Sequence, residues 1–205
     1  MEGLNLLLAA VGLGVALLLR PWRGLAAAGP PWPWLAGCTL LPVLWSADRL
    51  AHSAVVQPMS GVCLLTLMMG WPLTVLGLVP IGVAVLWLGD LGVAEAVQRG
   101  VWLGLLPATL AMGFGAGVRR WLPNHLMVYI LGRGFFATLL AVSATSAIDL
   151  ALRGGPVALG MADLLLGRWL GAWGEAIITG MLTAVLVAFR PQWLATYSDR
   201  LYLPR

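Results

Sequence analysis

The chain has 205 residues, of which 60% are hydrophobic and 10% are charged, and its formal net charge at pH 7 is +4. Its mean hydropathy of +0.92 excludes a soluble domain of ordinary composition. All twelve basic residues are arginines that stand singly or in pairs beside apolar runs, which excludes the basic, aromatic-rich patch of a nucleic-acid-binding protein.

Seven apolar segments follow one another and predict an all-α multi-pass membrane protein that forms a single domain over residues 1–205. The only charge near the start is Glu2, so the first segment lacks the basic region of a signal peptide and is interpreted as a helix. Asp90, Glu95 and Arg99 fall between two segments and predict a connector. The expected helices cover residues 4–19, 34–46, 55–70, 72–89, 101–118, 126–148 and 162–189.

The third segment differs from the others because polar and helix-breaking residues interrupt it. Residues 57–72 read QPMSGVCLLTLMMGWP, with a proline and a glycine before the apolar run and a second glycine after it. Backbone broken in this way survives in a membrane only where protein buries it or where it lines a cavity. We therefore expect a functional site at this segment.

The loops between the segments differ in charge, and this difference predicts the topology. With the amino terminus outside and the carboxyl terminus in the cytoplasm, the outer loops hold four acids: Asp48, Asp90, Glu95 and Asp149. The cytoplasmic segments then hold one acid, Asp199, against seven arginines: Arg20, Arg23, Arg119, Arg120, Arg190, Arg200 and Arg205. The positive-inside rule favours this orientation for seven crossings.

Two ionisable residues lie within predicted membrane helices. Arg133 is about eight residues into the sixth helix, and Glu175 is near the middle of the seventh. An unpaired charge at membrane depth costs at least about 2.5–3.5 kcal/mol, so each residue is expected to face the bundle interior with a partner. We predict a contact between Arg133 and Glu175, direct or through water, as a structural ion pair or as part of a solute or proton path.

Few residues suggest metal or catalytic chemistry. Cys63, Met68 and Met69 share a helical face with Met59 and could form a soft site for monovalent copper, although Met and Cys are also ordinary core residues. A lone histidine such as His52 is usually an interfacial polar residue. We find no set of nucleophile, base and orienting group and do not expect an enzyme, and no cofactor is identified.

Three stretches resemble the CbiM-like family, the membrane substrate-binding components of energy-coupling factor transporters for cobalt and nickel. They are SGVCLLTLMMGWPLTVLGL from residue 60, LPNHLMVYILGRGFFATLLA from residue 122 and AWGEAIITGMLTAVLVAFRPQWLATYSDRLYL from residue 172. The resemblance covers residues 50–203, so residues 1–49 supply only the first two helices. The likeness is to a proteobacterial branch of the family. It implies a bundle of about seven helices in the inner membrane of a bacterium, with the amino terminus outside, and partner subunits that include an ATPase.

The resemblance also implies a metal site, and here the chain departs from the family. The family uses the terminal amine of Met1, a histidine as the second residue and a histidine before the third helix. This chain has Glu2 and Pro58 at those positions. The remaining candidate ligands are Met1, His52 and Met59, a degenerate set for nickel or cobalt.

Two functions follow from this resemblance. The chain is expected to be a permease component for transition-metal uptake with a partner ATPase. Alternatively, it is a scaffold without a site that serves as an accessory subunit of a respiratory, photosynthetic or monooxygenase complex. In both cases it contacts membrane lipid and other membrane subunits.

Overall fold

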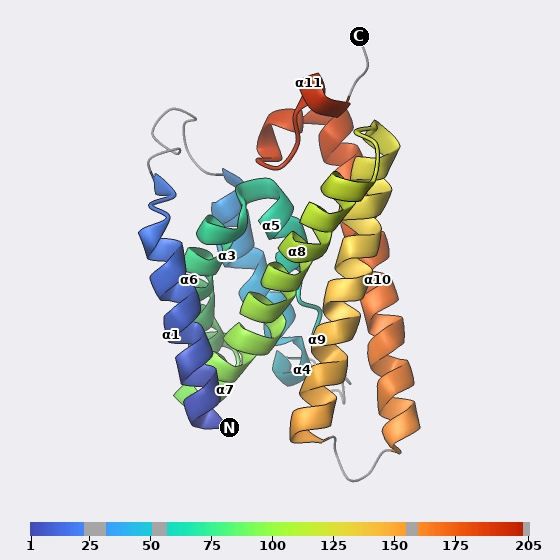
Figure 1. Ribbon diagram of the computed structural model, residues 1–205. Helices are drawn as coiled ribbons and strands as arrows, with labels where there is room; N and C mark the ends of the chain where they lie inside the picture. Colours follow the sequence, from blue (N-terminus) through green and yellow to red (C-terminus); the bar gives the residue numbers. More distant parts are fainter. Residues whose placement is uncertain (23–31, 51–56, 155–159, 203–205) are drawn as a thin grey trace.

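The computed structural model describes residues 1–22, 32–50, 57–154 and 160–202, and within these ranges every regular element is a helix (Figure 1). The all-α class is therefore confirmed. The elements are α1 (Glu2–Leu18), α3 (Trp32–Trp45), α4 (Ala47–Leu50), α5 (Val62–Met69), α6 (Trp71–Leu88), α7 (Val93–Arg99), the π-helix η1 (Gly100–Leu105), α8 (Leu106–Trp121), the π-helix η2 (Val128–Phe136), α9 (Ala137–Arg153), α10 (Met161–Phe189), the 3₁₀-helix η3 (Pro191–Trp193) and α11 (Asp199–Tyr202).

In the described residues, four continuous helices are long and apolar enough to cross a membrane, as expected of a multi-pass membrane protein. They are α6, the run α7–η1–α8, the run η2–α9, and α10. The remaining apolar helices are shorter: α1 has 17 residues, α3 has 14 with Pro42 inside it, and α5 has only 8. The count of seven crossings stays a prediction.

The expected connector around Glu95 and Arg99 is wrong. Both residues belong to α7, which continues into the membrane helix through the π-helical turn η1. The guanidinium of Arg99 forms ion pairs with Glu95 and with Asp48, at 3.0 and 2.7 Å. Arg49 also pairs with Glu95, at 3.2 Å, so two arginines and two acids offset one another where the helix extends beyond the apolar run.

The helices form one bundle with the two termini at opposite ends (Figure 1). At one side α1 packs against α6, and at the other α9 packs against both α8 and α10. Close approach is possible at small residues: a Cβ on Gly132 would lie 2.7 Å from Val118, and one on Gly12 would lie 2.7 Å from Leu105. Membrane helices associate mainly through such close packing.

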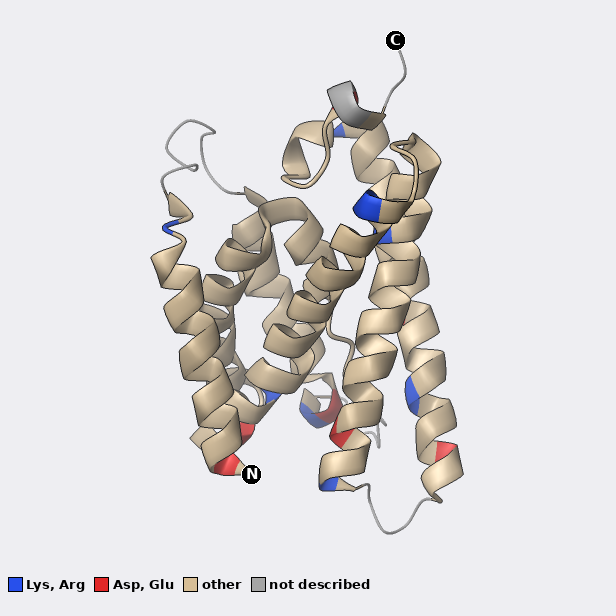
Figure 2. Cartoon of the chain, in the orientation of Figure 1, with Lys and Arg blue, Asp and Glu red and all other residues tan. Residues whose placement is uncertain are grey.

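Charged residues lie mainly at the two ends of the bundle, and the acids gather at one of these ends (Figure 2). The end with the amino terminus holds most of the acids, among them Glu2 in α1, Asp48 in α4 and Asp163 in α10. The opposite end carries Arg119 and Arg120 in the last turn of α8. This asymmetry matches the expected loop charges, while the side of the membrane that each end faces stays a prediction.

Candidate functional site

The interrupted third segment becomes a short helix that begins inside the bundle. Residues 58–61 are not helical, and α5 starts at Val62. Pro58 has no N–H and disfavours helix at Gln57. Gly61 has φ of +65°, and an added Cβ would lie 2.6 Å from Leu41, so only glycine fits here. The prediction of one helix over residues 55–70 is wrong at residues 57–61, and residues 55 and 56 lie outside the described residues.

The start of α5 is capped by a carboxylate from α10. Oε2 of Glu175 accepts the N–H of Ser60 at 2.8 Å, and Oε1 accepts the N–H of Gly61 at 2.9 Å. The Ser60 hydroxyl accepts the N–H of Val62 at 3.2 Å. Glu175 is only 3% exposed. A carboxylate at a helix start is favourable because it accepts the free N–H groups and faces the positive end of the helix dipole.

The end of α5 is capped by the segment that follows α10. The N–H of Ala195 donates to the carbonyl of Met68 at 2.9 Å, and the hydroxyl of Thr196 donates to the carbonyl of Leu67 at 2.9 Å. Neither donor belongs to a neighbouring residue in the sequence. Both ends of this eight-residue helix thus depend on distant parts of the chain, as buried backbone in a membrane protein requires.

A cavity of about 220 Å³ lies beside this interruption, between α9, α10 and the extended residues. Its polar lining consists of Gln57, Ser146, Arg168 and Glu175, and Met59 adds a thioether. The Ser146 hydroxyl donates to Oε1 of Gln57 at 3.0 Å, which fixes the extended segment against α9. The small residues Gly167, Gly171 and Ala172 leave room opposite these groups.

A chain of polar contacts leads away from the cavity across the amino-terminal end of the bundle. Nη1 of Arg168 donates to Oδ2 of Asp149 at 2.9 Å, and Asp149 also pairs with Arg153. The Arg153 guanidinium lies over the Trp102 ring, 5.2 Å from its centroid. The Trp102 indole donates to Oδ1 of Asn5 at 3.0 Å. Helices α1, η1, α9 and α10 are therefore linked at one level.

The predicted contact between Arg133 and Glu175 is not formed as an ion pair, because each group has other partners. Nη1 of Arg133 donates to the carbonyl of Thr196 at 3.2 Å, and the guanidinium lies 5.5 Å from the centroid of the Tyr129 ring. Glu175 instead bonds to backbone at the start of α5. The side chain of Arg133 points toward the end of the bundle that carries Thr196. The positions of Arg133 and Glu175 along their helices do not predict this direction.

The candidate metal ligands are not gathered by the described structure. Met59 lines the cavity, whereas Met1 is 56% exposed at the start of α1, which packs on α6, α7 and η1. His52 lies outside the described residues. Within the described ranges, no group of three His, Cys, Asp or Glu side chains could hold a metal ion.

The soft-metal face is also not formed. Cys63 is buried in a cluster with residues of α8, α9 and α10. Met68 packs in a second cluster with Tyr129, and Met69 packs in a third with Trp45. The short length of α5 explains this, because each of its faces meets a different neighbour. These residues are core packing in this structure.

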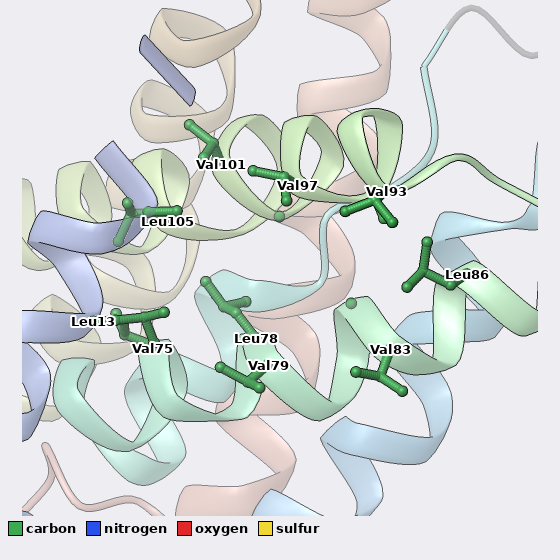
Figure 3. Close-up of a pocket in the computed structure, with 14 residues that line it drawn as sticks. Leu13, Val75, Leu78, Val79, Val83, Leu86, Val93, Val97, Val101 and Leu105 are labelled. Carbon is green, nitrogen blue, oxygen red and sulfur yellow. The ribbon is translucent and has the colours of Figure 1, made fainter. Parts of the chain in front are cut away.

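A groove on the opposite side of the bundle is apolar throughout (Figure 3). It has a volume of about 220 Å³ and is formed by α1, α6, α7 and η1. Aliphatic side chains such as Val75, Leu78, Val97 and Val101 point into it (Figure 3). It offers no polar side chain to orient a solute, so the cavity beside Glu175 is the better candidate for solute binding.

Sequence reasoning missed Arg168, which contributes the only guanidinium to the lining of the candidate cavity. The available signal was an arginine inside the apolar segment 162–189, where a charge needs a partner. Nothing in the sequence linked Ser146 or the loop acid Asp149 to Arg168. Comparison of the chain with protein-family models, with curated proteins and with solved structures finds no match.

Proposed function

We propose that the chain is the membrane permease component of an energy-coupling factor type, CbiM-like uptake transporter, with the cavity beside Glu175 as its solute site. The observation that carries this proposal is the interruption before α5. Non-helical backbone at Gln57–Met59 lines a cavity together with a buried carboxylate at a helix start. Transporters commonly bind solutes at such broken helices within the membrane.

The cargo that we propose is a transition-metal ion. Met59 offers a thioether, Gln57 an amide oxygen and Glu175 a carboxylate beside the cavity. His52 is five residues before Gln57 and would supply the imidazole that such ions favour. Transport against a gradient would need energy from partner ATPase subunits, since the chain contains no Walker motif.

The test is metal binding by the purified full chain in lipid nanodiscs. Metal content would be measured after purification, followed by equilibrium dialysis against Ni²⁺ and Co²⁺. We expect about one ion per chain, with binding weakened at least tenfold by Met59→Leu and by His52→Ala. The control is Met112→Leu, on α8, where the methionine is 44% exposed. A metal-free protein that also fails in dialysis would refute the metal cargo.

A second candidate function is that of an accessory subunit in a larger respiratory, photosynthetic or monooxygenase complex. The apolar groove on α1, α6 and η1 favours it, because two of its lining residues are glycines with free space above them. An added Cβ on Gly82 or Gly100 would meet no atom within 4 Å. Helices from partner subunits pack closely at small residues of this kind.

The groove permits a direct test of this second candidate. The protein would be extracted from its native membrane in a mild detergent, and the size of its complex would be measured. Gly82→Leu and Gly100→Leu would fill the groove and release the partner, whereas Gly113→Leu on α8, also open to free space, would not. A complex of unchanged size in both groove variants would refute this use of the groove.

A further inference from the structure

A second cavity lies between α9 and α10, on the other side of Arg168 from the solute site. Its volume is about 420 Å³, and its polar lining consists of Ser143, Ser146 and Arg168. Leu165, Leu166 and Trp169 form its apolar part and are 45–55% exposed at the outer surface of α10. The cavity therefore has a polar wall toward the bundle and an apolar wall toward the lipid.

The charges around this cavity do not balance. Asp149 is the only carboxylate that pairs with either Arg153 or Arg168 in the described residues, so two positive charges share one negative charge. The side chains of Asp149 and Arg168 are only 6% and 11% exposed, whereas Arg153 is 22% exposed and does not line the cavity. An excess positive charge in such a place is costly unless an anion accompanies it.

Two buried donors in the same region also lack partners. The hydroxyl of Ser143 and Nε of Arg168 are inaccessible to solvent and make no hydrogen bond within the described residues. Nη2 of Arg168 makes none there either, since both hydrogen bonds of this guanidinium use Nη1. Buried donors without partners are uncommon, and here they lie beside a cavity with excess positive charge.

The depth of the cavity indicates the kind of anion. Helix α10 has 29 residues, about 43 Å at 1.5 Å per residue, which exceeds a hydrocarbon core of about 30 Å. Arg168 stands seven residues after the first residue of α10, about 10 Å from that end. This level lies near the boundary between hydrocarbon and headgroups, where arginines contact lipid phosphates.

We propose that this cavity is a phosphate-binding site in which Arg168 and Ser143 hold the headgroup of an anionic phospholipid. The guanidinium supplies charge and the free donor at Nη2, and the Ser143 hydroxyl supplies a second donor when its side chain turns toward the cavity. The acyl chains would lie along Leu166 and Trp169. The site does not depend on the proposed transport function, because the lipid would enter from the membrane and not through the solute cavity.

The test is lipid retention by the full chain, measured by native mass spectrometry. The purified protein would be incubated with equal amounts of phosphatidylglycerol and phosphatidylcholine. We expect at least a fivefold preference for phosphatidylglycerol in the native chain, little or none in Arg168→Gln, and a reduced preference in Ser143→Ala. Arg49→Gln serves as the control, because this exposed arginine lies in α4, away from the cavity.

The variants are designed so that folding does not obscure the result. Arg168→Gln leaves the balanced pair of Asp149 and Arg153. Ser143→Ala removes an unpartnered hydroxyl and should leave the melting temperature unchanged. A parallel titration with inorganic phosphate distinguishes the two sources: displacement of the lipid in an Arg168-dependent manner would support a phosphate site open to small anions. Equal retention of both lipids by the native chain and by Arg168→Gln, with no effect of phosphate, would overturn the proposal.

Discussion

The carboxylate of Glu175 and the N–H of Gly61 are joined by a hydrogen bond of 2.9 Å across 114 residues of sequence. This contact closes the start of a helix that begins within the bundle, and the second oxygen does the same for Ser60. The only charge in the middle of α10 is therefore used to satisfy backbone. It also lines the cavity of about 220 Å³ beside α5, so a change at this carboxylate would be felt both in the cavity and at the start of α5.

Replacing Glu175 should destabilise α5 first. Glu175→Ala leaves two buried N–H groups without an acceptor, at about 1–3 kcal/mol each, whereas Glu175→Gln keeps one acceptor and should lose about half as much. Thermal unfolding followed by tryptophan fluorescence would measure the difference. Hydrogen exchange should show that the loss of protection is concentrated at the backbone N–H groups of residues 60–63. The control is Glu2→Gln, because Glu2 is exposed at the start of α1 and has no ion pair within the described residues. Equal melting temperatures for Glu175→Ala and Glu175→Gln would contradict the capping role.

Gly61 should not tolerate a side chain. Gly61→Ala places a methyl group in a left-handed conformation that costs about 1–2 kcal/mol, and the new Cβ would lie 2.6 Å from Leu41. We expect a clear fall in melting temperature. Gly14→Ala in α1 is a matched control, because its Cβ meets no atom within 4 Å and the change favours helix. Similar behaviour of the two variants would argue against the observed turn before α5.

The hydroxyl of Thr196 should contribute about 1 kcal/mol to stability through its bonds to the Leu67 carbonyl and to Tyr129. Thr196→Val removes the hydroxyl at nearly constant shape, and Thr196→Ser retains it. We expect a lower melting temperature for Thr196→Val and an unchanged melting temperature for Thr196→Ser. A double-mutant cycle with Tyr129→Phe should give a coupling energy of at least about 0.5 kcal/mol, and additive effects would show that the two hydroxyls act separately.

The ion pair of Asp48 with Arg99 should make stability depend on pH. The hydrogen bond from Arg99 lowers the pKa of the Asp48 carboxyl below its usual 3.8. A carboxyl with a lowered pKa stabilises the fold at pH values above about 3.8 and loses this contribution as the pH falls through its folded-state value. The native chain should therefore lose more stability than Asp48→Asn between pH 5 and pH 3, measured by chemical denaturation. If the free energy of unfolding changes with pH by the same amount in the native chain and in Asp48→Asn, the prediction is refuted.

The predicted orientation can be tested by labelling single cysteines in intact cells. Cys38 and Cys63, the two cysteines of the chain, would first be replaced by alanine. A membrane-impermeant maleimide should then label Glu2→Cys from outside, but should label Gln192→Cys only after lysis, because the two termini lie at opposite ends of the bundle (Figure 1). Outside labelling at both positions would refute an odd number of crossings.

Apolar periodicity predicted most of the helices well. The segment expected at 162–189 is α10 at Met161–Phe189, and the segment expected at 72–89 is α6 at Trp71–Leu88. These elements are long and uniformly apolar, so local composition decides them. The helix expected at 101–118 begins earlier, at Val93, where Arg49 and Arg99 pair with Asp48 and Glu95, a contact that composition alone does not reveal.

The candidate site was located in the sequence but its contacts were not. Proline and glycine around residue 60 correctly indicated irregular backbone beside a cavity. The partner of Glu175 was expected to be another charge, yet it is the backbone of Ser60 and Gly61, which carries no signature in sequence. Arg133 likewise bonds to the carbonyl of Thr196. Backbone partners of this kind depend on which segments meet in space.

The cap that Thr196 and Ala195 form on α5 also determines when this helix can be completed during synthesis of the chain. Leu67 leaves the ribosome 129 residues before Thr196, roughly ten seconds at ordinary elongation rates. During that interval the last carbonyls of α5 have no partner, and the nascent third segment must be sheltered by the insertion machinery or by water. Completion of the bundle is thus a late, post-insertion event that begins when the residues after α10 fold back.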